Sequence, residues 1–229
     1  MATIAIVGAG PGLGLAIGRV FGGHGFDVAL IARTSSNVDG YVDELSAAGI
    51  TAAGFAADVT DRAALATALR AAAARFGRID VLEYSPYAGL VRIAPEELTV
   101  AALQPRIDEI LFGAVAATEV VLPPMLEAGS GTLLYTVGGG AIDPLPFLGS
   151  INTAQAALRN WVHNLHGTLA TRGVHVADVV VNVGITTRPT PGLPQRHPDE
   201  IAQLYWDLHS GRREREIVVA PDGRIDRQT

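Results

Sequence analysis

The sequence predicts a doubly wound α/β domain, with a parallel sheet of about seven strands and helices on both faces. Short runs rich in Val and Ile alternate with longer stretches of helical periodicity along nearly the whole chain. Alternation of this kind implies right-handed crossovers, which cover both faces of a parallel sheet. A chain of 229 residues can bury one substantial core. We therefore expect a single domain over residues 1–229.

The individual elements follow from the same alternation. The expected strands are the apolar runs at 3–7, 27–32, 51–57, 79–84, 131–137, 174–181 and 216–220. Helical periodicity lies between them, at about 12–24, 38–48, 61–76, 98–127, 150–171 and 198–212. Asp61 is suited to cap the third helix and Gly77 to end it. Prolines crowd the segment 184–198, so we expect an irregular loop there.

Composition excludes several classes of chemistry. The net charge is −6, and the 17 basic residues are scattered arginines, which predicts no nucleic-acid partner and no anionic-membrane surface. The chain has no cysteine, which removes disulfides, thiolate metal sites and cysteine nucleophiles. It also has no lysine. No window approaches the roughly 18 apolar residues of a membrane span, and no signal peptide is evident, so a cytoplasmic location is expected.

A glycine-rich turn, "VGAGPGLGLAIG", follows the first strand and opens the first helix. Glycines in this context allow a tight turn and close approach of the backbone to a pyrophosphate at a helix N-terminus. Gly8, Gly12 and Gly14 fit the spacing G-x-x-x-G-x-G, whereas G-x-G-x-x-G fails in every frame. The turn therefore predicts dinucleotide binding through Gly8, Gly10, Gly12, Leu13 and Gly14.

This spacing resembles the first turn of the short-chain dehydrogenases/reductases, and the resemblance extends over nearly the whole chain. It implies a single Rossmann-type domain, a nicotinamide cofactor, and a homodimer or homotetramer. It also implies that the region 184–212 forms the substrate loop and its helix, and that Thr186 holds the cofactor carboxamide.

Two further segments carry the resemblance toward the adenosine end of the cofactor. The run "AADVTD" resembles the segment that follows the family's third strand, which implies that Asp58 and Val59 border the adenine. The second strand ends in "IARTSS", which places Arg33 and Thr34 beside the adenosine ribose. Members that prefer NAD usually have an acidic residue there, and a guanidinium instead favours a 2′-phosphate. NADP(H) is therefore expected over NAD(H).

The family's catalytic Asn, Ser, Tyr and Lys have no counterparts at the matching positions. Aligning "GSINTAQAALRNW" on the family's Tyr-x-Ala-Ser-Lys pattern places Ile151 at the Tyr and Gln155 at the Lys. Counting back 13 residues from the Tyr position gives Gly138 at the Ser, and "EILFG" gives Ile110 at the Asn. Without a lysine in the chain, no change of register restores the pair. General acid–base catalysis contributes roughly 10²–10⁴ in rate, so the usual chemistry should be very slow.

Several side chains are weaker candidates for the missing roles. Tyr84 and Tyr87 lie near the end of the fourth strand and are candidate proton donors, but without a cation nearby the pattern favours aromatic pocket lining. Gln155 retains the ability to hydrogen-bond the cofactor ribose. His163 and His166 lie three apart on one helix, but no third ligand is spaced to join them, so we expect surface or interface residues and no metal.

Three hypotheses of function remain open. The first is an oxidoreductase that acts on a carbonyl or alcohol through a different proton donor, where positioning supplies most of the rate. The second is a catalytically silent module that senses NADP(H). The third is a non-catalytic subunit that pairs with an active relative in a hetero-oligomer through the helices at 98–127 and 150–171.

Overall fold

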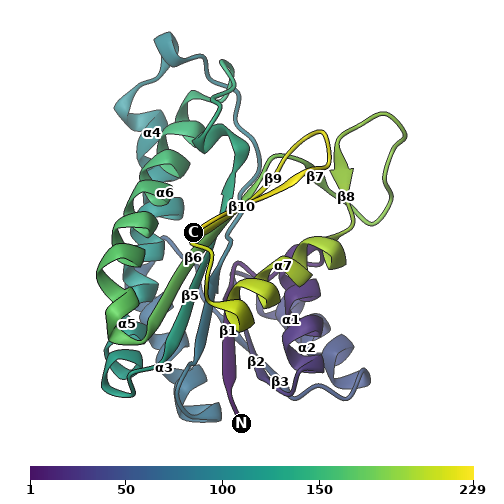
Figure 1. The fold of residues 1–229 in the computed structure, drawn as a ribbon, viewed down its shortest axis with the longest axis vertical. Helices are drawn as coiled ribbons and strands as arrows, with labels where there is room; N and C mark the ends of the chain where they lie inside the picture. Colours follow the sequence, from purple (N-terminus) through teal and green to yellow (C-terminus); the bar gives the residue numbers. More distant parts are fainter.

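A central sheet of eight strands runs through the computed structural model, which describes residues 1–229 (Figure 1). The strand order is β3-β2-β1-β4-β5-β6-β9-β10. In chain order the strands are β1 (Thr3–Val7), β2 (Asp27–Ala32), β3 (Ala52–Ala56), β4 (Val81–Tyr84), β5 (Gly131–Gly138), β6 (Val174–Val181), β9 (Glu216–Val219) and β10 (Ile225–Gln228). All neighbours pair in parallel except β9 and β10. The doubly wound α/β fold is confirmed, with one strand more than expected.

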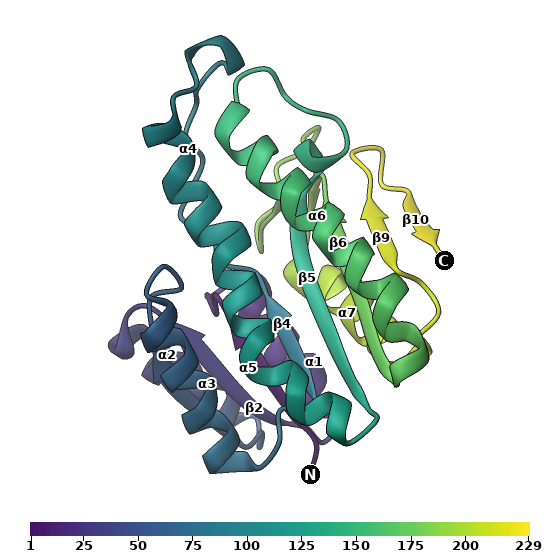
Figure 2. The same ribbon diagram turned by 90° about the vertical axis from the view of Figure 1, so that its left-hand side faces the viewer.

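Two layers of helices cover the sheet, one on each face (Figures 1 and 2). On one face lie α1 (Leu13–Gly23), α2 (Ser35–Ala47) and α7 (Pro198–Gly211). On the other lie α3 (Arg62–Phe76), α4 (Val100–Arg106), α5 (Gly113–Glu127) and α6 (Gly149–Leu169). Each layer encloses its own hydrophobic cluster. The six inner strands are therefore buried on both faces, which is why they appear in the sequence as largely apolar runs, whereas the edge strands β3 and β10 are more exposed.

The long helix expected at 98–127 is divided into three parts. A π-helical turn, Ile107–Phe112, separates α4 from α5, and Pro105 lies just before it. Tyr84, at the end of β4, donates a hydrogen bond from its hydroxyl to the carbonyl oxygen of Glu109 inside this turn, at 2.5 Å. Because a π-helical turn interrupts the regular α-helical hydrogen bonds, it makes such a carbonyl available to a side chain.

The segment 184–198 is less irregular than expected. It forms two short parallel strands, β7 (Gly184–Ile185) and β8 (Gln195–Arg196), separate from the main sheet. The amide of Gly184 donates to the carbonyl of Pro194 at 2.8 Å, and the amide of Thr186 donates to that of Arg196 at 3.0 Å. The prolines supply no donor to this ladder, and Pro194 contributes its carbonyl instead. The expectation of a loop without regular structure was therefore wrong at its two ends.

By length and composition, the stretch Val100–Glu127 is apolar enough to cross a membrane, with a mean hydropathy of 1.5 over its most apolar window. No membrane span was expected from the sequence because charged residues, among them Arg106, Asp108, Glu109 and Glu119, interrupt this stretch. Half of the window is buried inside the protein, in the cluster between the sheet, α3 and α6. The stretch therefore packs as a core helix of this fold.

Candidate functional site

The carboxyl ends of β1, β4, β5 and β6 meet along one edge of the sheet. The strand order reverses between β1 and β4, because the chain adds β2 and β3 on one side of β1 and the remaining strands on the other. In open α/β sheets, ligands bind outside the carboxyl ends at this point of reversal. The glycine-rich turn, the loop after β4 and the start of α6 all lie along this edge.

The glycine-rich turn packs directly against the residues that follow β4. Gly8 has a φ of +92°, and a Cβ there would lie 2.5 Å from the Cα of Pro86. A Cβ at Gly14 would lie 2.9 Å from the Cα of Ala9. No atom lies within 4 Å of the corresponding position at Gly12. Two of the three motif glycines are thus required by backbone packing, and the third leaves open space beside the turn.

Helix α1 begins at Leu13 with no side chain capping its N-terminus. Its first turn contains no acidic residue. The leading N–H groups of a helix have no partner within the helix, and together with the helix dipole they favour an anion. The turn therefore offers the open space, the free donors and the dipole that a pyrophosphate needs, and a nicotinamide dinucleotide fits the residues present.

The predicted adenosine residues lie at the ends of β2 and β3. Arg33 and Thr34 are exposed after β2, and Asp58 is exposed after β3. The amide and hydroxyl of Thr60 hydrogen-bond to Oδ1 of Asp58, at 2.9 and 2.7 Å, and they hold the pKa of Asp58 below its ordinary value. The positive charge of Arg33 acts in the same direction. Val59 is buried in the core, so Asp58 is the residue of this pair that presents its side chain.

Gly138 and Gln155, which the sequence alignment predicts at the family's Ser and Lys positions, are brought together at the end of β5. A Cβ at Gly138 would lie 2.7 Å from Oε1 of Gln155. A serine at position 138 would therefore require Gln155 to turn away. Ile151 and Ile110, which the alignment predicts at the Tyr and Asn positions, are both buried. These four positions together offer one polar side chain, the amide of Gln155.

The glycines that follow Gly138 pack against two more amide side chains. A Cβ at Gly139 would overlap Asn182 at the end of β6, and a Cβ at Gly140 would overlap Asn152 of α6. Asn152 donates to the carbonyl of Leu145 at 2.8 Å, but its buried Oδ1 has no partner. The triple glycine thus makes room for amides rather than hydroxyls.

The two candidate tyrosines lie in contrasting environments. Tyr84 is 1% exposed, its hydroxyl is bound to Glu109, and burial raises its pKa well above the ordinary value. Tyr87 is 69% exposed, and no hydrogen bond ties its side chain to this edge of the sheet. Thr186 is half-buried, and its hydroxyl accepts a hydrogen bond from the amide of Arg188 at 3.1 Å.

Sequence reasoning missed a buried acid beside this edge. Glu83 of β4 is 0% exposed, and burial raises its pKa to about 8. Its carboxyl group accepts hydrogen bonds from the hydroxyls of Ser85 and Thr136, both at 2.9 Å. Thr136 in turn lies 2.6 Å from the hydroxyl of Tyr205 in α7. The available signal was an acidic residue inside an apolar strand, "VLEY".

His163 and His166, expected from the sequence to be surface or interface residues, are half-buried and both contact the sheet. Nε2 of His163 lies 2.9 Å from Asp178 of β6 and 3.4 Å from Glu216 of β9, and both carboxylates are fully buried. His166 contacts the carbonyl of Val176. Because α6 packs on these strands, the acidic partners of His163 come from the sheet rather than from the helix. Arg159 binds Glu216 at 2.5 and 2.9 Å, so a guanidinium already occupies the carboxylate that a metal would need.

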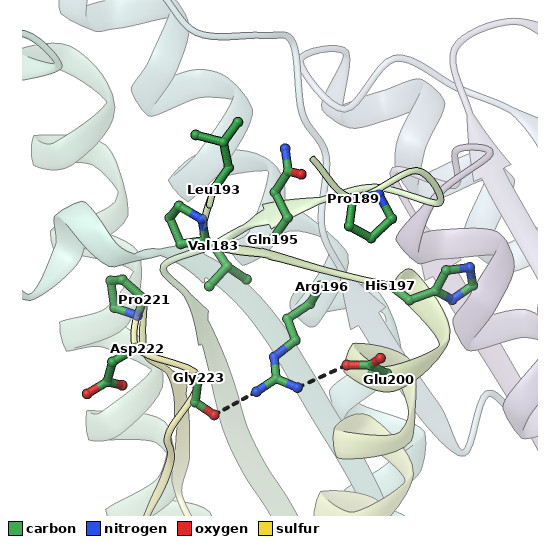
Figure 3. A pocket seen from close by; sticks show the side chains of 11 residues that line it. Val183, Pro189, Leu193, Gln195, Arg196, His197, Glu200, Pro221, Asp222 and Gly223 are labelled. Carbon is green, nitrogen blue, oxygen red and sulfur yellow. Dashed lines mark hydrogen bonds and ion pairs between the residues drawn. The ribbon is translucent and has the colours of Figure 1, made fainter. Parts of the chain in front are cut away.

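A separate hollow of about 340 Å³ lies between the substrate loop, the start of α7 and the turn between β9 and β10 (Figure 3). The Arg196 side chain spans it, donating to Glu200 at 3.0 Å and to the carbonyl of Gly223 at 2.6 Å (Figure 3). None of the glycine-turn residues lines this hollow. It is therefore distinct from the predicted nucleotide site.

Comparison with known proteins identifies the family. The sequence matches the short chain dehydrogenase family over residues 2–196. D-threitol dehydrogenase from Mycolicibacterium smegmatis is 34% identical over 225 residues, covering 96% of this chain and 78% of the relative. The chain therefore belongs to the short-chain dehydrogenase family, whose members are oxidoreductases that use a nicotinamide dinucleotide.

Solved structures show the same fold at low sequence identity. L-sorbose reductase from Gluconobacter frateurii, complexed with NADPH and L-sorbose, has a TM-score of 0.83 and 20% identity, covering 92% of this chain and 90% of that one. An NADPH-bound short chain oxidoreductase from Pseudomonas aeruginosa PAO1, containing an atypical catalytic center, has a TM-score of 0.82 and 19% identity. That match covers 91% of this chain and 89% of the other.

The packing of the glycine turn makes a testable distinction between two of its glycines. Gly8→Ala should lower the free energy of unfolding by about 2–4 kcal/mol, because its Cβ meets backbone at a positive φ. Gly12→Ala should change it by less than about 0.5 kcal/mol, since open space surrounds that position. Urea denaturation of both variants measures the difference. Equal stability losses would contradict the described packing.

Proposed function

We propose that this protein is an NADP(H)-dependent oxidoreductase that interconverts a carbonyl and an alcohol with a proton donor other than the family's tyrosine. The observation that carries the proposal is the glycine turn, which combines open space at Gly12 with an uncapped helix α1. A backbone arranged in this way favours binding of a phosphate. When bound, the nicotinamide supplies or accepts the hydride.

The proposed cofactor preference rests on Arg33. Its guanidinium is exposed at the end of β2, close enough to Asp58 to act on that carboxylate. A planar, permanently charged fork is suited to a 2′-phosphate, which a neutral or acidic side chain would not favour. NADP(H) is therefore proposed over NAD(H).

Two side chains at this edge of the sheet are proposed to bind the nicotinamide end of the cofactor. Gln155 is proposed to hydrogen-bond the nicotinamide ribose, and Thr186 to hold the carboxamide. Neither side chain moves a proton, so each serves binding and orientation. The two relatives named above act on D-threitol and L-sorbose. Small polyhydroxylated alcohols and ketones are therefore the first substrates to test.

A second function is favoured by one specific observation, the absence of any lysine from the chain. A protein that binds NADP(H) and lacks the usual proton donor is also suited to sensing the cofactor, or to serving as a non-catalytic subunit beside an active relative. The assembly proposed for the enzyme is a homodimer or homotetramer.

One paired experiment separates these functions. NADPH and NADH are titrated by protein fluorescence, and NADPH consumption is then measured over a panel of ketoses, aldehydes, ketones and quinones. D-threitol with NADP⁺ tests the oxidative direction. Binding with turnover supports the enzyme. Binding without turnover supports the sensing module, and absence of binding contradicts both.

Arg33→Asp should shift the ratio of NADPH to NADH affinity by at least about tenfold toward NADH, since a repulsive charge replaces the partner of the 2′-phosphate. Arg70→Asp, an exposed arginine of α3, is the matched control for the change in net charge. The two dissociation constants are measured for each variant. An unchanged ratio in Arg33→Asp would argue against the 2′-phosphate contact.

A further inference from the structure

Glu83 is a carboxyl group in the middle of the sheet, without any cation to balance it. It lies on the face covered by α1 and α7, next to Val81 on the same side of β4. The polar groups near it are all hydroxyls. Ser85 directly follows β4, Thr136 lies on β5, and Tyr205 of α7 contacts the hydroxyl of Thr136. The one titratable group among them is Tyr205, whose own pKa is raised well above its ordinary value by burial. Burial without a cation favours the neutral acid.

The protonation state of Glu83 decides which way the hydroxyl of Ser85 points. An ionised carboxylate only accepts, so it would hold the hydroxyl protons of both Ser85 and Thr136. A neutral carboxyl carries one O–H and donates it to one of these neighbours. When the recipient is Ser85, the serine accepts from Glu83 and its own O–H becomes free to donate elsewhere.

Ser85 lies where a donated proton is useful. It is the first residue after β4, and its amide donates to the carbonyl of Val7 at 2.9 Å. Its carbonyl carbon lies 2.7 Å from where a Cβ at Gly8 would stand, so its backbone lies against the glycine turn. Ser85 is half-buried, while Glu83 behind it is closed to solvent. The serine thus connects a shielded acid to the edge where the cofactor is proposed to bind.

We infer that Ser85, hydrogen-bonded to Glu83, is the proton donor of this site. Ser85 is the catalytic residue, and Glu83 is the residue that positions and reprotonates it. This inference rests on the proposed function. It assigns to a serine and a buried acid the role that the family gives to a tyrosine and a lysine.

The reaction balances without any further reagent. A hydride from NADPH forms the new C–H bond, and the carbonyl oxygen takes the Ser85 hydroxyl proton to form the alcohol. Ser85 takes the proton of Glu83 at the same time, so NADP⁺, the alcohol and the Glu83 carboxylate are the products. Solvent returns the proton to Glu83 through Ser85 after the alcohol leaves. Oxidation follows the same path in reverse, with ionised Glu83 as the acceptor.

A pKa near 8 suits this task, because a general acid works best when its pKa lies close to the working pH. The carboxyl group is then protonated at neutrality and still able to give the proton up. Reduction should therefore weaken as Glu83 ionises above about pH 8, and oxidation should strengthen.

The protonation of Glu83 can be tested without any turnover. Infrared spectroscopy of the wild-type protein at neutral pH should show the C=O band of a buried protonated carboxyl, which Glu83→Gln removes and Ser85→Ala shifts. The band should fade as the pH rises through about 8. A carboxylate already ionised at neutral pH overturns the inference.

Thermal stability provides a second measurement that needs no substrate. The folded pKa of about 8 lies above the ordinary value of 4.5, so the stabilising contribution of the protonated form is complete below pH 4.5 and is lost as the pH rises through 8. Glu83→Gln, which preserves the shape and donates from its amide, should gain Tm relative to wild type across this window. A difference in Tm that stays constant with pH would contradict the shifted pKa. Effects of other titrating groups, present in both proteins, cancel.

Turnover tests the role of Ser85 directly. With any carbonyl that the wild type reduces, Ser85→Ala should lower kcat by about 10²-fold or more while the dissociation constant of NADPH stays unchanged. Ser85→Thr, which keeps the hydroxyl, should retain most of the rate, and Ser46→Ala, on the exposed face of α2, is the surface control. Glu83→Gln should lose the dependence of kcat on pH near 8.

The outcomes distinguish this inference from the proposed function. Wild-type turnover that survives in both Ser85→Ala and Glu83→Gln overturns the inference and leaves the oxidoreductase intact. A wild type that binds NADPH and reduces nothing overturns both. Loss of turnover in Ser85→Ala, rescue by Ser85→Thr and unchanged NADPH binding support both.

Discussion

The contact between the glycine turn and the end of β4 is the one on which the rest of the site depends. Gly8 and Pro86 approach so closely that no side chain fits between them. The carboxyl ends of the neighbouring parallel strands β1 and β4 are therefore held together at one edge of the sheet. Two features of the site follow from this contact: the position of the uncapped helix α1 and the position of Ser85 at the end of β4. A backbone approach of this kind needs glycine because a β-carbon would separate the strands.

The fold was predictable because most of its strands are buried on both faces. Seven of the eight appear in the sequence as apolar runs, and Asp61 caps α3 as expected, accepting from the amides of Ala63 and Ala64. The eighth strand, Ile225–Gln228, was missed because it lies at an exposed edge and buries nothing that a hydrophobic pattern reveals. The π-helical turn was missed because it depends on Tyr84, which is 25 residues away from Glu109 in the chain.

The candidate site was predictable in position but not in chemistry. Spacing in the sequence predicts Gly138 and Gln155 at the family's Ser and Lys positions. Only the structure shows that Gln155 fills the space that a serine would use. Likewise, an acidic residue in "VLEY" was visible in the sequence, but its meaning depends on Thr136 and Tyr205, which come from two other elements. Chemistry at this edge is set by contacts between elements, and periodicity within one element carries no information about them.

Two physical routes bring a proton donor to a pKa near neutrality. The family's usual route begins with a phenol, whose ordinary pKa is 10, and lowers it with the positive charge of a lysine. This chain has no lysine to place beside a phenol. The opposite route begins with a carboxyl group, whose ordinary pKa is 4.5, and raises this pKa by removing water, as burial does at Glu83.

Burial also closes the acid to the substrate, so a partly exposed group must carry its proton outward. Ser85 satisfies that requirement, since it bonds Glu83 on one side and borders the glycine turn on the other. The buried acid and its serine are therefore a coherent alternative to a tyrosine and a lysine.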